Sequence, residues 1–230
     1  MEHVKARHVG RAWFTSDLML GSERDAEHRN HDSADQMNSV IADRWNELVK
    51  PYDTVWILGN LIGGQSDETR SAAFGVAQRL NGTKYLLAGP LDPCLSGQYP
   101  YAAREAVRYR ELAGLKAVVT GKEFVNDDTA PQRRRVPIQI PLLGGASHGH
   151  PNVMLSAFHY PEPGARDDDF ARYRPRWEKR RAEQSPYLIH GEAPWVVRDY
   201  PPGKAVNVSM DAWGFEPVSA EMVADMLRSD

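Results

Sequence analysis

The sequence predicts an α/β fold, and two observations lead to that prediction. Short apolar runs rich in β-branched and aromatic residues recur along the chain. Helical patterns, with apolar residues three and four positions apart, separate the early runs. The later half of the chain is richer in strands and loops. Strands that alternate with helices are typical of α/β proteins, so this class is expected.

The expected strands, in chain order, begin with Trp13 to Ser16, a short buried run that breaks at Asp17. Each later run is apolar and short enough to be a buried strand. These runs are Thr54 to Leu58, Tyr85 to Ala88, Ala117 to Val119, Val153 to Leu155, Tyr187 to Ile189 and Val206 to Val208.

Four helices are expected from the apolar spacing. In Ser33 to Val49, apolar side chains recur on one face, and Ser33 is suited to be the N-cap. The same pattern covers Glu68 to Leu80 and Ala102 to Leu112. Ser219 to Leu227 closes the chain, with Ser219 as the expected cap.

The composition points to one domain spanning residues 1–230. The chain is 41% hydrophobic and has a formal charge of −3, which gives no overall signal for nucleic-acid or membrane binding. No apolar run approaches the roughly 20 residues that span a bilayer. The N-terminus lacks the apolar stretch of a secretory signal, and the single cysteine, Cys94, cannot form an internal disulfide. A cytoplasmic location is therefore expected.

Two charged, proline-containing segments are interpreted as insertions: Asn126 to Pro137 and Glu162 to Pro186. The second has an acidic run followed by basic residues, which include Arg172, Arg174, Arg176, Arg180 and Arg181. These arginines could contact a partner or, with nearby aromatic residues, a nucleotide or nucleic acid. The sequence favours a solvated helix, because the two charge blocks neutralise each other locally.

Polar residues follow several of the expected strands. In α/β folds ligands bind at the carboxyl ends of strands, so these positions are the candidate site. They include Asp17 after the first strand, Asn60 after the second, His159 after "VMLSAF" and Glu192 after "YLIH".

The motifs around these positions resemble those of the calcineurin-like metallophosphoesterases, in particular their small bacterial and phage branch. The relevant stretches are "FTSDLMLGS", "YDTVWILGN", "LNGTKYLLAGPLDP", "FHYP", "IHGEAP" and "NVSMDAWGFEPVS", and they occur in the family's order. The resemblance runs from about Trp13 to the C-terminus, apart from the insertions and the stretch from Cys94 to Val136. It implies a four-layer α/β/β/α sandwich of two mixed β-sheets flanked by helices.

The resemblance also implies a chemistry. Enzymes of this family hold two metal ions that clamp a phosphate, and a bound hydroxide attacks the phosphorus. Such ions prefer carboxylate, imidazole and amide ligands. An aspartate between the two dications reduces their repulsion.

Most of the family's ligand positions are altered in this chain, although Asp17 and His159 match the pattern. The substituted positions are Met19, Asn60, Pro90, Leu91, Glu192 and Pro194. Met, Leu and Pro offer no useful ligand to a hard dication. We therefore expect Met19, Leu91 and Pro194 to make the pocket apolar, and backbone amides to hold Asp17.

These substitutions predict a catalytically inactive homologue that acts by binding a protein or a phosphate-containing ligand, with no cofactor required. The alternative is an active phosphomono- or diesterase with an altered site. In that case Asp17, Asn60, His159 and Glu192 would hold one divalent ion weakly, such as Mn, Fe or Zn.

Overall fold

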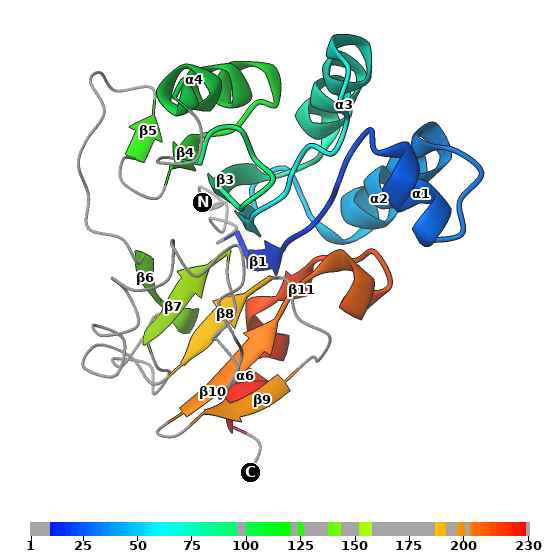
Figure 1. Cartoon of the computed structure of the whole chain (residues 1–230). Helices are drawn as coiled ribbons and strands as arrows, with labels where there is room; N and C mark the ends of the chain where they lie inside the picture. The colour runs from blue at the N-terminus through cyan, green and yellow to red at the C-terminus, as the bar shows by residue number, and fades with distance from the viewer. Residues whose placement is uncertain are drawn as a thin grey trace, which may run out of the picture.

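The computed structural model describes residues 10–95, 100–120, 124–126, 138–143, 152–157, 187–191, 197–200 and 203–228. In these ranges the chain forms two mixed β-sheets with helices packed against them (Figure 1). The prediction of an α/β fold is confirmed at this level.

The first sheet has six strands in the spatial order β11-β1-β2-β3-β4-β5. The four central strands run parallel, and β11 and β5 pair antiparallel at the edges. Their bounds are β1 Ala12–Thr15, β2 Thr54–Leu58, β3 Thr83–Leu87, β4 Ala117–Val119, β5 Phe124–Asn126 and β11 Val218–Ser219.

The second sheet has five strands in the order β6-β7-β8-β10-β9. Strands β7, β8 and β10 are parallel, and β6 and β9 pair antiparallel at the edges. Their bounds are β6 Ile138–Pro141, β7 Asn152–Ser156, β8 Leu188–His190, β9 Val197–Tyr200 and β10 Gly203–Asn207.

The helices begin at side-chain caps in most cases. Ser33 Oγ accepts from Gln36 N, and Ser219 Oγ accepts from Met222 N, which confirms both expected caps. A capping box joins Ser66 and Thr69. The bounds are α1 Glu23–His28, α2 Ala34–Leu48, α3 Asp67–Arg79, α4 Ala102–Leu112, the short 3₁₀ helix η3 Met210–Trp213 and α6 Ala220–Arg228.

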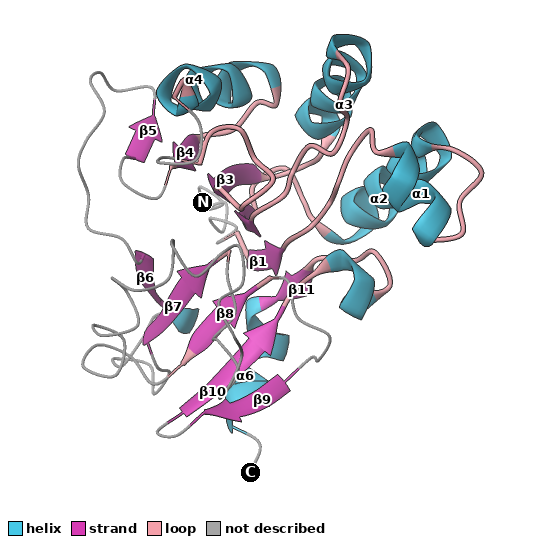
Figure 2. Cartoon of the chain, viewed as in Figure 1, coloured by secondary structure: helices cyan, strands magenta, loops and turns pink. Residues whose placement is uncertain are grey.

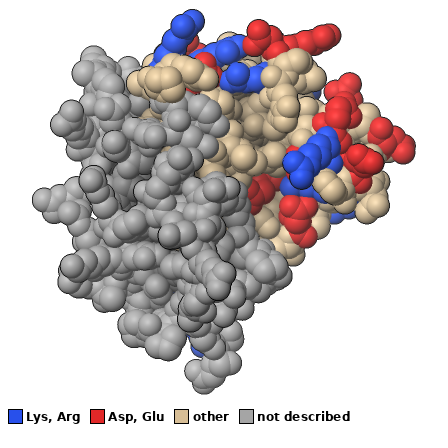
Figure 3. All heavy atoms as spheres, in the orientation of Figure 1, with Lys and Arg blue, Asp and Glu red and all other residues tan. Residues whose placement is uncertain are grey.

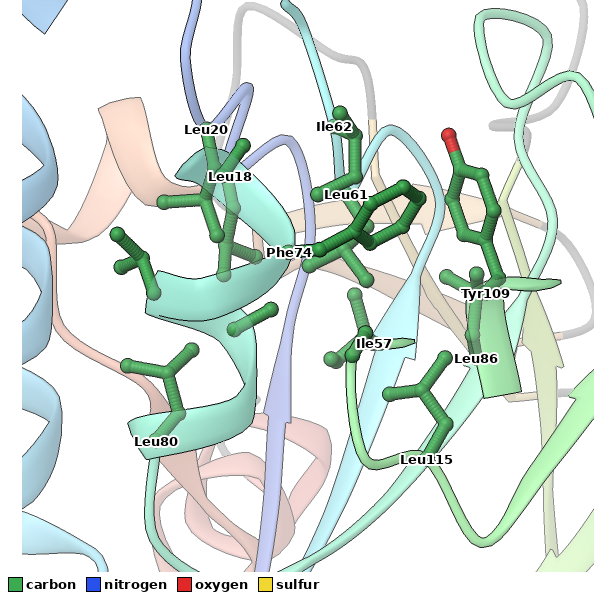
Figure 4. Packing of buried hydrophobic residues seen from close by; sticks show 14 of the residues in the cluster. Leu18, Leu20, Ile57, Leu61, Ile62, Phe74, Leu80, Leu86, Tyr109 and Leu115 are labelled. Carbon is green, nitrogen blue, oxygen red and sulfur yellow. The ribbon is translucent and has the colours of Figure 1, made fainter. Parts of the chain in front are cut away.

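One hydrophobic core lies between the first sheet and helices α2, α3 and α4, which gather on one side of that sheet (Figure 2). Trp13, Val55 and Ile57 enter it from alternate positions of their strands, as expected for the period of two in a strand. Leu18 and Leu20 join the same core beside Phe74 of α3 (Figure 4). The apolar residues after Asp17 therefore serve helix packing.

A second core contains side chains from both sheets and from α6. Phe14 and Leu58 come from the first sheet, Leu155 and Ile189 from the second, and Val223 from the last helix. All five are at most 1% exposed. The two sheets therefore share one apolar core.

Several elements were not expected from the sequence. They are α1, η3 and the strands β5, β6, β9 and β11. The predicted helices agree with the structure to within one residue at each end, because each has a clear apolar period over nine or more residues. The unexpected elements have six residues or fewer, too few to show a period.

Candidate functional site

The carboxyl ends of strands from both sheets meet beside Asp17. The residue before it, Ser16, lies just after β1 and forms a parallel bridge with Ser209, just after β10. Ser16 N donates to Val208 O at 3.0 Å, and Val208 N donates to His190 O of β8 at 2.8 Å. The end of β1 is thus joined by main-chain bonds to the second sheet.

Glycines allow this close approach. A Cβ placed on Gly89, after β3, would lie 2.7 Å from Asn60 Oδ1. A Cβ on Gly191, after β8, would lie 2.5 Å from Ser16 Oγ and 3.1 Å from Asp17 Oδ2. Only glycine lets these backbones reach the polar groups at the strand ends.

Asp17 and Asn60 form the centre of the site. Asn60 Nδ2 donates to Asp17 Oδ1 at 2.7 Å, and Ser16 Oγ donates to Asp17 Oδ2 at 2.8 Å. Asp17 is 7% exposed and Asn60 is 2% exposed. The sequence predicts backbone amides as the partners of Asp17, whereas two of its partners in the structure are side chains.

The orientation of the Asn60 amide follows from its second bond. Leu91 N donates to Asn60 Oδ1 at 3.0 Å, and a backbone N–H can only donate. The atom facing Leu91 is therefore the amide oxygen, and the NH₂ group faces Asp17. A neutral side chain thus satisfies the Asp17 carboxylate.

Asp92 lies buried beneath this pair. Its carboxylate accepts hydrogen bonds from the backbone N–H groups of Gly89, Asn60 and Leu61, at 2.8, 2.8 and 3.0 Å. Burial raises the pKa of Asp92 to about 6, although these three donors oppose the rise. Asp92 thus fixes the loops after β2 and β3 against each other.

The backbone at the site is strained. Asp17, Met19 and Asn60 have φ angles of 58°, 53° and 52°, in the left-handed region that non-glycine residues seldom occupy. Each such residue costs about 1–2 kcal/mol. Strained residues persist only where surrounding contacts hold their conformation, and they cluster at functional sites.

Arg29 is a site residue that sequence reasoning missed. Its guanidinium donates to the carbonyl oxygens of Asp17 and Leu18, at 2.7 and 3.1 Å, and forms an ion pair with Asp211. No motif marked this arginine, because its acidic partner lies 182 residues away in the sequence.

Of the other predicted site residues, the structure describes three, and the rest lie outside the described ranges. Pro90 is buried beside the site, Met19 is half-buried, and Leu91 is 50% exposed. Leu91 contributes its backbone N–H to the site, and an apolar pocket formed with Met19 and Pro194 stays a prediction. His159, Glu192 and Pro194 lie outside the described residues, as do Arg172, Arg174, Arg176, Arg180 and Arg181.

A two-metal centre does not fit the described part of the site. The two-metal centre that the resemblance implies would need a carboxylate at position 60, and Asn60 instead presents an NH₂ group to Asp17 and its oxygen to Leu91. Within the described ranges, no three His, Cys, Asp or Glu side chains come together as a metal-binding group.

A separate hollow of about 700 Å³ lies between α2 and α3, away from the strand ends. Polar side chains line most of it, among them Asp35, Asn38 and Arg79. On the described part of the face shown in Figure 3, acidic and basic side chains are interspersed. In the part of the chain that the structure describes, no helix is long and apolar enough to cross a bilayer.

No protein-family model matches the chain. It is 31% identical to the Gene 66 protein of Mycobacterium phage L5, over 96% of this chain and 95% of that protein. It is 29% identical to the Gene 66 protein of Mycobacterium phage D29, over 89% and 90%.

Among solved structures, the protein of unknown function AQ665 from Aquifex aeolicus matches with a TM-score of 0.60 and 17% identity. The match covers 94% of this chain and 98% of that one. At this identity the likeness indicates a shared fold only.

Proposed function

The chain belongs to the family of the mycobacteriophage Gene 66 proteins, and we propose that it is a catalytically inactive metallophosphoesterase homologue that acts by binding. Its two mixed sheets with a shared core, and the helices packed against the first sheet, support this proposal, because a four-layer α/β/β/α sandwich also contains two facing sheets. The ligand would be a protein or a phosphate-containing molecule.

The observation that carries this proposal is the hydrogen bond from Asn60 Nδ2 to Asp17 Oδ1. In the active enzymes of the resembled family, a carboxylate bridges two dications at this place. Here an uncharged amide satisfies Asp17 directly. When each oxygen of a buried carboxylate already accepts a hydrogen bond, the group can stay buried without a metal cation as its partner.

Among the described residues, the position of the leaving-group acid is also altered relative to the resembled family. The family's histidine at that position is replaced by Leu91, whose side chain can neither donate nor accept a proton. An enzyme without the bridging carboxylate and without this acid would lose both the activated hydroxide and the proton donor. Binding is the function that such a site retains.

The first experiment measures metal content and hydrolysis together. The purified protein is loaded with Mn²⁺, Fe²⁺ or Zn²⁺, dialysed and assayed by elemental analysis, and then tested on a bis-aryl phosphate and on an aryl phosphate. We expect less than one metal per chain and no turnover above buffer. Two metals per chain with turnover would overturn the proposal.

One metal per chain without turnover would instead indicate the residual site formed by Asp17, Asn60, His159 and Glu192. Such a site could bind a phosphate-containing ligand without hydrolysing it. Isothermal titration with inorganic phosphate, with and without Mn²⁺, separates this outcome from a metal-free binding protein.

The partner surface is proposed to be the charged insertion of residues 162–186, which carries Arg172, Arg174, Arg176, Arg180 and Arg181. New functions commonly arise on loops of a rigid scaffold. Deletion of residues 167–184 is expected to abolish capture of a protein partner while the thermal unfolding midpoint stays unchanged. Undiminished capture would contradict this surface. Loss of binding to a single-stranded oligonucleotide would indicate the nucleic-acid alternative.

A further inference from the structure

We propose that Arg29 is a positioning residue for the Asp17–Asn60 pair. Its side chain holds the main chain of the left-handed turn from which the Asp17 carboxylate projects. Arg29 would thereby fix the distance between the two side chains that define the candidate site.

The contacts of Arg29 reach two distant parts of the chain. Nη2 donates to Asp17 O at 2.7 Å, and Nη1 donates to Leu18 O at 3.1 Å. Nε and Nη2 donate to the two carboxylate oxygens of Asp211, each at 2.8 Å. The Arg29 side chain is only 6% exposed, so its bonds to the two carbonyls are partly shielded from water, whereas the Asp211 side chain is 56% exposed.

The turn needs this support because of its conformation. Asp17 and Met19 both have left-handed φ angles, which disfavour the turn unless other contacts hold it. The N–H groups of these two residues donate to Gly59 O and Asn60 O. The carbonyls of Asp17 and Leu18 have Arg29 as a donor, so the turn is held on both sides.

Arg29 is itself fixed in place. It is the C-cap residue of α1, where Arg29 N donates to Asp25 O and the N–H of the next residue, Asn30, donates to Glu27 O. Its guanidinium lies 5.6 Å from the centre of the Phe215 ring, a cation–π distance. The planar fork can therefore meet two carbonyls and one carboxylate at once, which a lysine cannot do.

Arg44 is a natural control. It approaches the same Phe215 ring, at 6.0 Å, and donates to Gly214 O. It touches neither Asp17 nor Leu18 in any of these contacts. Replacing Arg44 perturbs the same aromatic ring and the same C-terminal turn, but leaves the main chain at Asp17 held.

The test observes the site itself. The side-chain NH₂ signals of Asn60 report its bond to Asp17 in a ¹H–¹⁵N spectrum, once assigned with the Asn60→Ala variant. We expect Arg29→Lys to shift both signals and to speed their exchange with water. Arg44→Lys should leave both properties unchanged.

A purely structural role predicts a different result. In that case Arg29→Lys lowers the thermal unfolding midpoint, while the Asn60 signals of the folded protein stay where they are, and the proposal is overturned. If Arg29→Lys does not fold, Asp211→Asn replaces it, because Asp211 is 56% exposed and its carboxylate fixes the guanidinium that donates to both carbonyls, so that its loss loosens those bonds. A smaller shift of the same Asn60 signals supports the proposal, and unchanged signals in Asp211→Asn overturn it.

This inference concerns the same site as the proposed function, but its readout does not depend on activity. The Asn60 signals are measured whether or not the protein hydrolyses phosphate esters. Failure of this experiment therefore leaves the metal and hydrolysis results standing, and the reverse also holds.

Discussion

Asn60 joins Asp17 to Leu91 through a side chain that carries no charge. The amide donates to the carboxylate on one side and accepts a backbone N–H on the other. A carboxylate at this position would bring a second negative charge to within hydrogen-bond distance of Asp17, with Asp92 close by. Like charges at such a distance disfavour each other's ionised form.

Asn60→Asp is therefore expected to lower the free energy of unfolding at pH 7 by roughly 1–3 kcal/mol, because the bond to Asp17 is replaced by repulsion. Added Mn²⁺ should restore part of that loss, since a dication can neutralise both carboxylates. Chemical denaturation with and without Mn²⁺ measures both effects.

Asn38→Asp is the matched control for that change. Asn38 is also buried, at 3% exposure, and its Oδ1 accepts from Gly21 N, a role that a carboxylate can keep. We expect no Mn²⁺ rescue for this variant. An equal stabilisation of the two variants by Mn²⁺ would contradict the claim that a carboxylate at position 60 repels Asp17.

Asp92 and Asp53 are both buried carboxylates with three hydrogen-bond donors each, yet the pKa of Asp92 is raised and the pKa of Asp53 is lowered. Burial dominates at Asp92 and raises its pKa to about 6. At Asp53 burial also acts to raise the pKa, but donation from Lys50 N, Arg11 N and the Trp13 indole outweighs it, so the pKa is lowered.

The two residues should therefore give opposite pH dependence. The contribution of Asp92 to stability is fully present below its unfolded pKa of 3.8 and is lost as the pH rises through about 6. The free energy of unfolding of the wild type, relative to Asp92→Asn, is expected to increase between pH 7 and pH 4 by on the order of 2–4 kcal/mol.

For Asp53 the contribution is present above the unfolded pKa of 3.8 and is lost as the pH falls through the lowered folded value. The difference between wild type and Asp53→Asn should thus stay level from pH 7 to pH 4 and shrink below. Urea denaturation across this pH range measures both differences. Parallel curves for the two variants would refute the assignment of their environments.

The junction between the ends of strands β1 and β8 depends on Gly191, which has no side chain. Gly191→Ala would place a methyl group 2.5 Å from Ser16 Oγ, so the Ser16–Asp17 hydrogen bond must shift. We expect this change to lower the free energy of unfolding by about 1–3 kcal/mol, as overpacking typically does.

Gly75→Ala provides the comparison, because Gly75 lies inside α3 and the nearest atom to a new Cβ is Arg79 Nη1 at 3.8 Å. Alanine favours a helix over glycine by roughly 0.5–1 kcal/mol, so this variant should be more stable than wild type. Thermal melts of both variants test the pair. Stabilisation by Gly191→Ala would show that there is room for a methyl group between Gly191 and Ser16.

Some strands and helices could be predicted from the sequence alone, and others could not. Helices α2, α3 and α4 were predictable because their apolar period repeats over three turns or more. The two residues of β11 contain no pattern, and their strand character arises from pairing with β1. Asp17 and Asn60 could be placed together because parallel strands end at the same edge. Arg29 could not, since its contacts depend on tertiary structure.

At the scale of the whole molecule, the first sheet contributes to both cores. Trp13 and Ile57 face the helices, while Phe14 and Leu58 face the core shared with the second sheet. Loss of packing in either core should therefore weaken the same sheet. This sharing favours unfolding of the described structure as one unit.

Ile57→Ala and Ile189→Ala test this expectation, one in each core, and both residues are fully buried. Each is expected to cost about 2–5 kcal/mol. Both should shift one common transition, seen alike by far-ultraviolet circular dichroism and by tryptophan fluorescence. Separate transitions, each moved by only one of the variants, would indicate two independent units.

The ion pair between Arg29 and Asp211 has a consequence for how the protein is made. During synthesis on the ribosome, β1 and Arg29 emerge early, whereas Val208, Asp211 and β11 emerge near the end. The nascent chain can form α2, α3 and the central strands, but it cannot complete the turn at Asp17 until its last segment is released. Assembly of the candidate site is therefore a late, long-range step, and contacts of this kind slow folding.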